Sequence, residues 1–172
     1  MRHKYTYPKP SSNFLKKLVE FSKRYTYSSI LISGDNHDKY SKFNTIAALG
    51  SKEIISSSSN SFKELLSFHN HHKDWMFGFL SYDIKNEIED LRSENIDQFK
   101  FPNLEFFIPE TILFISNEDM KVESFLSENE ISGLLEEINN SDTIPKNDSD
   151  VELNCRETKE EFLKKIERIK KH

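Results

Sequence analysis

The sequence is poor in cysteine, glycine and long hydrophobic runs and carries no net positive charge, and each of these absences excludes a class of protein. Cys155 is the only cysteine, so no disulfide framework is possible and a reducing cytoplasm is the expected location. No window approaches the roughly 18 apolar residues of a membrane-spanning helix, and the amino terminus lacks the apolar core of a signal peptide. The net charge of −5, with both signs mixed along the chain, does not fit a nucleic-acid-binding protein.

The sequence also lacks recognisable catalytic motifs, and it therefore predicts no catalytic residue and no metal ligand. There is no Gly-x-Ser-x-Gly segment, and the glycines at 34, 50, 78 and 133 stand singly, which excludes a phosphate-binding loop. The cluster His69-Asn-His-His72 lacks companion ligands for zinc and fits the solvated end of a helix. A group of carboxylates offers ligands for Mg²⁺, although a solvated acidic helix start is the preferred interpretation. These carboxylates belong to Asp83, Glu87, Glu89 and Asp90.

The sequence is rich in aromatic residues, with 14 phenylalanines offsetting a hydrophobic content of only 35%. The segment from Trp75 to Asp83 is the most informative, because Gly78 stands inside an aromatic strand pattern. A glycine in such a position indicates a bulge or a close approach of a neighbouring backbone. The aromatic residues on both sides predict a strand that is buried on both faces.

Hydrophobic periodicity predicts a mixture of helices and strands. Helices are expected over 13–24, 61–70, 85–91 and 128–139, and from residue 158 onward. Strands are expected over 29–33, which is short and buried, over 43–49, which Gly50 would stop, and over 54–55 and 75–82. The segments 111–116 and 120–125 predict a hairpin, and 104–108, between two prolines, predicts an edge or crossover segment.

Composition divides the chain into three parts. Residues 1–139 are expected to form one domain, 140–150 a polar linker, and 151–172 the start of a second domain. The spacing of Thr158 and Glu161 is that of a capping box at a helix start. The apolar stripe of this helix has little to pack on, so we expect a polypeptide that is cut within the helix; a natural helical tail is the alternative.

Three blocks, in order, resemble the amino-terminal region of aminodeoxychorismate synthase component I, within the superfamily of chorismate-utilising enzymes that includes anthranilate synthase component I. The first block is Leu31-Ile-Ser-Gly34 followed by Tyr40-Ser-Lys-Phe43, and the second is Phe77-Gly-Phe-Leu-Ser-Tyr-Asp83. The third, Arg156-Glu-Thr-Lys-Glu-Glu-Phe-Leu-Lys-Lys-Ile166, is similar to the entry into the chorismate-binding domain. The resemblance implies an α+β fold, a sandwich of antiparallel β-sheets with flanking helices.

By motif position, the resemblance implies a small pocket that holds tryptophan, lined by Ser33, Tyr40, Ser41 and Phe43. An aromatic ring suits the indole, and hydroxyls suit the amino and carboxylate groups. The structural alternative is that the hydroxyl of Ser33 only satisfies a strand end, and that the two aromatic residues are core. Anthranilate synthases tend to carry Glu where this chain has Ile32, which favours the aminodeoxychorismate branch.

The resemblance implies that the complete enzyme converts chorismate and ammonia to 4-amino-4-deoxychorismate, a folate precursor. Its implied requirements are Mg²⁺, held by the complete enzyme only, and a glutamine amidotransferase subunit as the ammonia source. The present chain would be the non-catalytic amino-terminal part, because it has no Asp-Leu-x-Arg-Asn-Asp or Ile-Lys-Gly-Thr segment. Two alternatives stay open: anthranilate synthase component I, and a stand-alone amino-acid-binding module without catalysis. No nucleic acid and no membrane are expected as partners.

Overall fold

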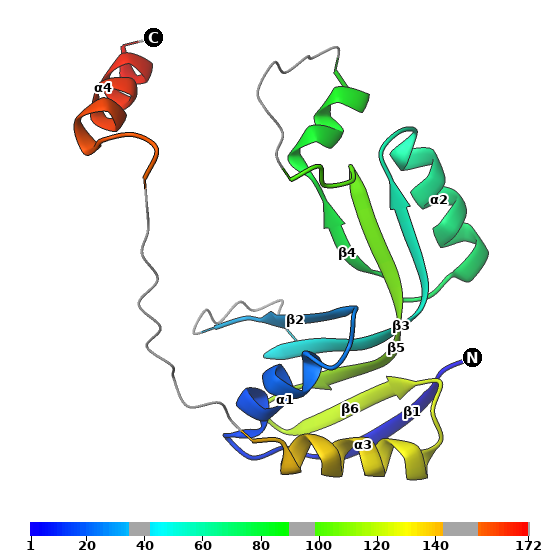
Figure 1. Cartoon of the computed structure of the whole chain (residues 1–172). Coiled ribbons are helices and arrows are strands. Elements are labelled where there is room, and N and C mark those ends of the chain that lie inside the picture. The colour runs from blue at the N-terminus through cyan, green and yellow to red at the C-terminus, as the bar shows by residue number, and fades with distance from the viewer. Residues whose placement is uncertain (35–41, 90–98, 143–154, 172) are drawn as a thin grey trace.

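The chain folds around one antiparallel sheet with helices packed beside it, as the computed structural model of residues 1–34, 42–89, 99–142 and 155–171 shows (Figure 1). The strands are β1 (His3–Pro8), β2 (Ser28–Ile32), β3 (Thr45–Ser57), β4 (Phe77–Leu80), β5 (Leu104–Ile115) and β6 (Asp119–Ser124). The helices are α1 (Phe14–Ser22), α2 (Ser61–His72), the 3₁₀-helix η1 (Tyr82–Glu87), α3 (Glu128–Asn140) and α4 (Lys159–Lys170). The predicted α+β class, with an antiparallel sheet and flanking helices, is confirmed.

Two long strands, β3 and β5, pair along nearly their whole length and form the spine of the sheet (Figure 1). The expectation that Gly50 ends a strand was wrong, and 54–55 is the second half of the same strand. Gly50 adopts a left-handed φ of +68°, and the register shifts between Ser51 and Glu53, opposite Pro109. A glycine with positive φ beside a bulge lets the strand bend and continue.

The segment 104–108 is likewise not an edge or crossover, because it forms the first half of the central strand β5. Pro109 interrupts no essential ladder bond, since it lies at the irregularity where β3 changes register. The predicted hairpin of 111–116 and 120–125 is confirmed as the β5–β6 pair. Strand β1 was not expected from the sequence; it pairs with β6 from His3↔Ser124 to Pro8↔Asp119.

One face of the sheet carries the main apolar core under α1 and α3. Leu18 of α1 and Ile131 and Ile138 of α3 are fully buried against Leu113 and Val122 of the sheet. The inward side of α3 is therefore the predicted one, and its start has the capping box formed by Ser127 and Glu130. In the view of Figure 1, this core packs against the lower half of the sheet.

The opposite face is aromatic. Phe77, Phe107 and Phe114 are buried there with Ala48 and Ile112, and Tyr27, Phe43 and Ile46 pack against them. Strand β2 and strand β4 are less buried than expected, because each lies at an edge of the sheet. Leu31 and Ile32 of β2 and Phe79 and Leu80 of β4 are exposed. A run of apolar residues therefore predicted these strands correctly but overstated their burial.

Two helices lie away from the main core. Helix α2 contacts β3, and only Ser61 at its start is buried, so its predicted apolar side is largely exposed. Helix α4 begins with the predicted capping box, in which the backbone N–H of Glu161 donates to Thr158. None of its residues is buried. The predicted linker lies mostly outside the described residues, as does the turn expected after Gly34.

Candidate functional site

Two of the four predicted pocket residues lie together where β2 ends and β3 is about to begin. The Ser33 hydroxyl donates to the carbonyl oxygen of Phe43 at 3.1 Å, and the Ser33 N–H donates to the carbonyl oxygen of Asn44 at 3.0 Å. The antiparallel pairing of β2 and β3 brings these positions together, from Ser28↔Leu49 to Ile32↔Thr45. Tyr40 and Ser41 lie outside the described residues.

Phe43 connects the predicted pocket to the aromatic face of the sheet. Its ring centroid lies 5.0 Å from that of Phe114, and the ring of Trp75 lies 5.3 Å from the same phenylalanine. Phe77 of the second sequence block is buried in the same aromatic cluster, so the first and second blocks meet on this face of the sheet. Trp75 is 47% exposed, so one side of this aromatic row is open to a ligand or to further protein.

Two of the four carboxylates considered for a metal ion, Glu87 and Asp83, have partners within the protein instead. Glu87 accepts hydrogen bonds from the N–H and hydroxyl of Ser61, at 2.7 and 2.5 Å, and from the amide of Asn103 at 2.7 Å. Asp83 lies 3.3 Å from the amine of Lys85. Glu87 thus ties η1 to the beginning of α2 and to the segment before β5. Asp90 lies outside the described residues.

The hydrogen bonds from Ser61, with a further one from Asn103, hold the pKa of Glu87 below its usual value of 4.5. A depressed pKa means that the carboxylate stabilises the fold above its unfolded-state pKa, and that this contribution is lost as the pH falls through the folded-state pKa. We expect Glu87→Gln to lower the urea midpoint at pH 7, with the difference from wild type shrinking as the pH falls from 4.5 through the lowered folded-state pKa. Glu89→Gln, at an exposed neighbouring position, is the control. A difference for Glu87→Gln that stays constant throughout an acid titration of stability would contradict this role.

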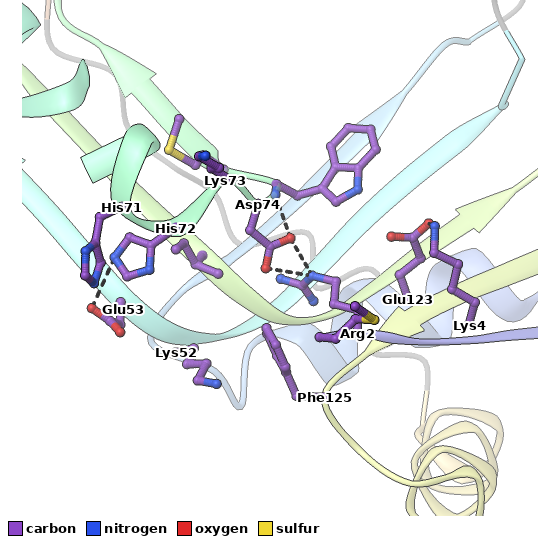
Figure 2. Close-up of a pocket in the computed structure, with 14 residues that line it drawn as sticks. Arg2, Lys4, Lys52, Glu53, His71, His72, Lys73, Asp74, Glu123 and Phe125 are labelled. Carbon is purple, nitrogen blue, oxygen red and sulfur yellow. Dashed lines mark hydrogen bonds and ion pairs between the residues drawn. The ribbon is translucent and has the colours of Figure 1, made fainter. Parts of the chain in front are cut away.

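A cavity of about 720 Å³ lies between the amino-terminal strand and the end of α2 (Figure 2). It is bounded by β1, by β3 just after the bulge, by the segment from Lys73 to Met76 and by the end of β6. The histidine cluster contributes to it, because His71 and His72 line the wall. The cavity size is in the range of small-molecule sites.

Arg2 organises this cavity. Its guanidinium donates to both carboxylate oxygens of Asp74, at 2.7 and 3.0 Å, and to the carbonyl oxygens of Pro109 and Glu110. The side chain of Arg2 is 5% exposed and also lies 4.3 Å from the ring centre of Phe125. This one side chain, directly before β1, therefore connects the amino terminus to the bend of β5 and to the loop before Trp75.

The other charges of the cavity are only partly paired. Lys4 lies 2.9 Å from Glu123, and Nε2 of His72 lies 3.3 Å from Glu53. Lys52 lies instead over the ring of Phe125, with its amine 4.1 Å from the ring centre. Figure 2 shows Lys52 and Lys73 at different sides of the wall that holds the His72–Glu53 pair.

Sequence reasoning found the histidines of this cavity but not its central pair. Arg2 and Asp74 are 72 residues apart, and neither stands in a recognisable motif. The amino terminus and the segment between α2 and β4 meet only in the folded chain, so no local pattern indicates this pair.

No three His, Cys, Asp or Glu side chains in residues 1–34, 42–89, 99–142 and 155–171 are grouped so that they could hold a metal ion. In that same part of the chain, no helix has the length and apolar character needed to cross a membrane.

Comparison with known proteins gives one family. The profile of the family described as chorismate binding enzyme matches residues 21–172, which leaves β1 and most of α1 outside the match. Curated individual proteins give no significant match. The matched region includes the aromatic face, the β2–β3 pair and α4, while Arg2 and Lys4 of the cavity precede it.

Proposed function

The chain belongs to the chorismate binding enzyme family, and from this premise we propose that it is the amino-terminal, non-catalytic part of an aminodeoxychorismate synthase component I. The observation that carries the narrower assignment is the block Leu31-Ile-Ser-Gly34 with Tyr40-Ser-Lys-Phe43. The complete protein would use chorismate and ammonia to make 4-amino-4-deoxychorismate, with ammonia from a glutamine amidotransferase subunit. The contribution of this chain is a scaffold sheet and one wall of a regulatory pocket.

Magnesium, which the resemblance implies for the complete enzyme, does not fit the side chains described here. The described residues hold no group of three carboxylate, histidine or cysteine ligands, and the Glu87 carboxylate already accepts three hydrogen bonds. A magnesium site built from carboxylates needs free oxygens around the ion. No step of the proposal therefore passes through a metal on this chain.

The proposed pocket takes tryptophan between the ends of β2 and β3. Ser33 and Phe43 are adjacent, and Phe43 and the 47%-exposed Trp75, which both pack on the buried Phe114, offer ring surface for an indole. The Ser33 hydroxyl is exposed, and it can exchange its bond to the Phe43 carbonyl for one to a ligand. Tyr40 and Ser41 complete the pocket in this proposal by their motif positions.

Ser33→Ala is expected to weaken tryptophan binding by about 3- to 10-fold, because one hydrogen bond contributes about 0.5–1.5 kcal/mol. Isothermal titration calorimetry measures the affinity, and a thermal melt shows whether the fold is intact. Ser56→Ala is the matched control, because Ser56 is an exposed serine near the far end of β3. An unchanged affinity for Ser33→Ala would remove Ser33 from the pocket.

The test of the function is the product formed by the protein that the complete coding region encodes. With chorismate, ammonia and Mg²⁺, the expected product is 4-amino-4-deoxychorismate. Formation of anthranilate would instead assign the protein to anthranilate synthase component I. If no chorismate is consumed and tryptophan still binds to a monomer that melts cooperatively, the stand-alone amino-acid-binding module becomes the better account.

A further inference from the structure

We propose that the cavity around Arg2 binds a small aromatic oxyanion, meaning a ring that carries a carboxylate or a phosphate group. This inference rests on charged side chains that the synthase assignment does not use, and it shares only Trp75 with the proposed tryptophan pocket. The predicted tryptophan pocket is centred elsewhere, because neither Ser33 nor Phe43 lines this cavity. For brevity, the cavity lined by Arg2, Lys52, His71, Lys73 and Trp75 is called the Arg2 cavity below.

The first argument is the balance of charge in the Arg2 cavity. Each of its carboxylates has a basic partner: Asp74 has Arg2, Glu123 has Lys4, and Glu53 has His72. Lys52 and Lys73 also line the cavity, and within the described parts of the chain neither forms a salt bridge. The lining of the Arg2 cavity therefore carries more positive than negative charge, although the chain as a whole has a net charge of −5. A concave surface with surplus positive charge attracts anions.

The position of Lys52 is not explained by the helix that ends nearby. Basic residues at the end of α2 are favoured by the helix dipole, and this accounts for His69, His71 and His72 without any ligand. Lys52 belongs to β3, directly after the bend at Gly50, and its amine is placed over Phe125. A cation–π contact leaves the N–H groups of the ammonium free to donate to an anion.

The second argument is the apolar surface beside the charges. Trp75, Met76, Ile108 and Phe125 line the same cavity as the lysines. Trp75 is 47% exposed, which is a large share for an indole that also packs on Phe114. A ring against an aromatic wall, with its anionic group toward the lysines, would use both kinds of surface. Carboxylate and phosphate share this recognition, so the probes below include both.

Trp75 is the only tryptophan in the chain, so its fluorescence reports directly on this cavity. The protein is titrated with phenyl phosphate, with benzoate and with inorganic phosphate at constant ionic strength. Three variants are compared with wild type: Lys52→Gln, Lys73→Asn and the control Lys63→Gln. Asn suits position 73 because Lys73 has a left-handed φ of +49°, which Asn tolerates. Lys63 is an exposed lysine of α2 outside the cavity, and it matches the charge change.

The expected result is saturable binding of phenyl phosphate or benzoate that weakens about tenfold in each cavity variant and is unchanged in Lys63→Gln. Binding of phenyl phosphate alone selects a phosphate ligand, and binding of benzoate alone selects a carboxylate. The proposal is overturned if neither aromatic probe binds, if the cavity variants bind like the control, or if inorganic phosphate binds as tightly as phenyl phosphate. Thermal melts of all the variants show whether the fold is retained.

Discussion

Gly78→Ala is expected to detach β4 from the sheet and to lower the free energy of unfolding by about 3 kcal/mol or more. A Cβ atom at this position would lie 2.0 Å from the carbonyl oxygen of Glu105 and 2.6 Å from Cα of Phe106. Both atoms belong to the backbone of β5, which pairs with β4 from Phe77↔Phe107 to Leu80↔Leu104. No side-chain rotation relieves such a contact, so the two strands must separate.

Chemical denaturation measures the loss for Gly78→Ala, and Gly133→Ala is the matched control. Gly133 lies inside α3 with nothing within 4 Å of an added Cβ, so alanine there is expected to stabilise the protein by about 0.5–1 kcal/mol. Replacement of glycine by alanine is thus expected to lower the stability at position 78 and to raise it at position 133. A Gly78→Ala variant as stable as wild type would show that β4 does not pair with β5 as described.

The same variant also tests the connection between β4 and the aromatic face. Trp75 stands two positions before β4 and contacts Phe114, and Phe77 of β4 is buried beside Phe107. Separation of β4 is therefore expected to change the emission of the single tryptophan, even where the rest of the sheet remains folded. In the proposed function, tryptophan binding would be weakened with it, because Trp75 and Phe43 share Phe114.

The close approach at Gly78 was predictable from the sequence, while the burial of its strand was not. A glycine flanked by aromatic residues indicates tight backbone packing, which is a local property. Whether a strand lies in the middle or at the edge of a sheet depends on which distant segments pair with it. In the described structure β4 pairs with β5 alone, so Phe79 and Leu80 are exposed.

Gly50 shows the opposite case, in which a local rule gave the wrong result. Glycine usually weakens a strand, and the sequence predicted that β3 would stop there. Pairing with β5 continues on both sides of the bulge, and Gly50 supplies the positive φ at the bend. Tertiary contacts with a partner some 60 residues away, such as Leu49↔Thr111, therefore outweigh the local preference.

The two candidate sites also differ in how far the sequence could predict them. Ser33 and Phe43 meet because β2 and β3 are neighbouring antiparallel strands, and the tryptophan pocket that motif position assigns to them stays a prediction. The Arg2 cavity is built from β1, β3, β5, β6 and the end of α2, and no sequence window contains it. Its histidines were interpreted as a solvated helix end, which is consistent with their place in the last turn of α2.

Arg2→Met is expected to lower the free energy of unfolding by about 3 kcal/mol, because it leaves the Asp74 carboxylate without its charged partner. The side chains of Arg2 and Asp74 are only 5% and 19% exposed, so water compensates little for the lost pair. The carbonyl oxygens of Pro109 and Glu110 lose a donor at the same time. Methionine keeps much of the apolar stem, so the loss reports mainly on the charge and the hydrogen bonds.

A double-mutant cycle with Asp74→Asn separates the ion pair from the bonds to the backbone. The coupling between Arg2 and Asp74 is expected to exceed about 1 kcal/mol, with the remainder of the Arg2→Met loss due to the two carbonyl oxygens. Lys4→Met is the control: Lys4 lies two residues after Arg2, on β1, and is paired with Glu123, but its side chain is 74% exposed, so the loss of stability should stay below about 1 kcal/mol. Equal small losses for both variants would mean that β1 is held by its pairing with β6 alone. A large loss confined to Arg2 would establish that one arginine, outside the region that matches the family, locks the amino-terminal strand onto the bend of β5.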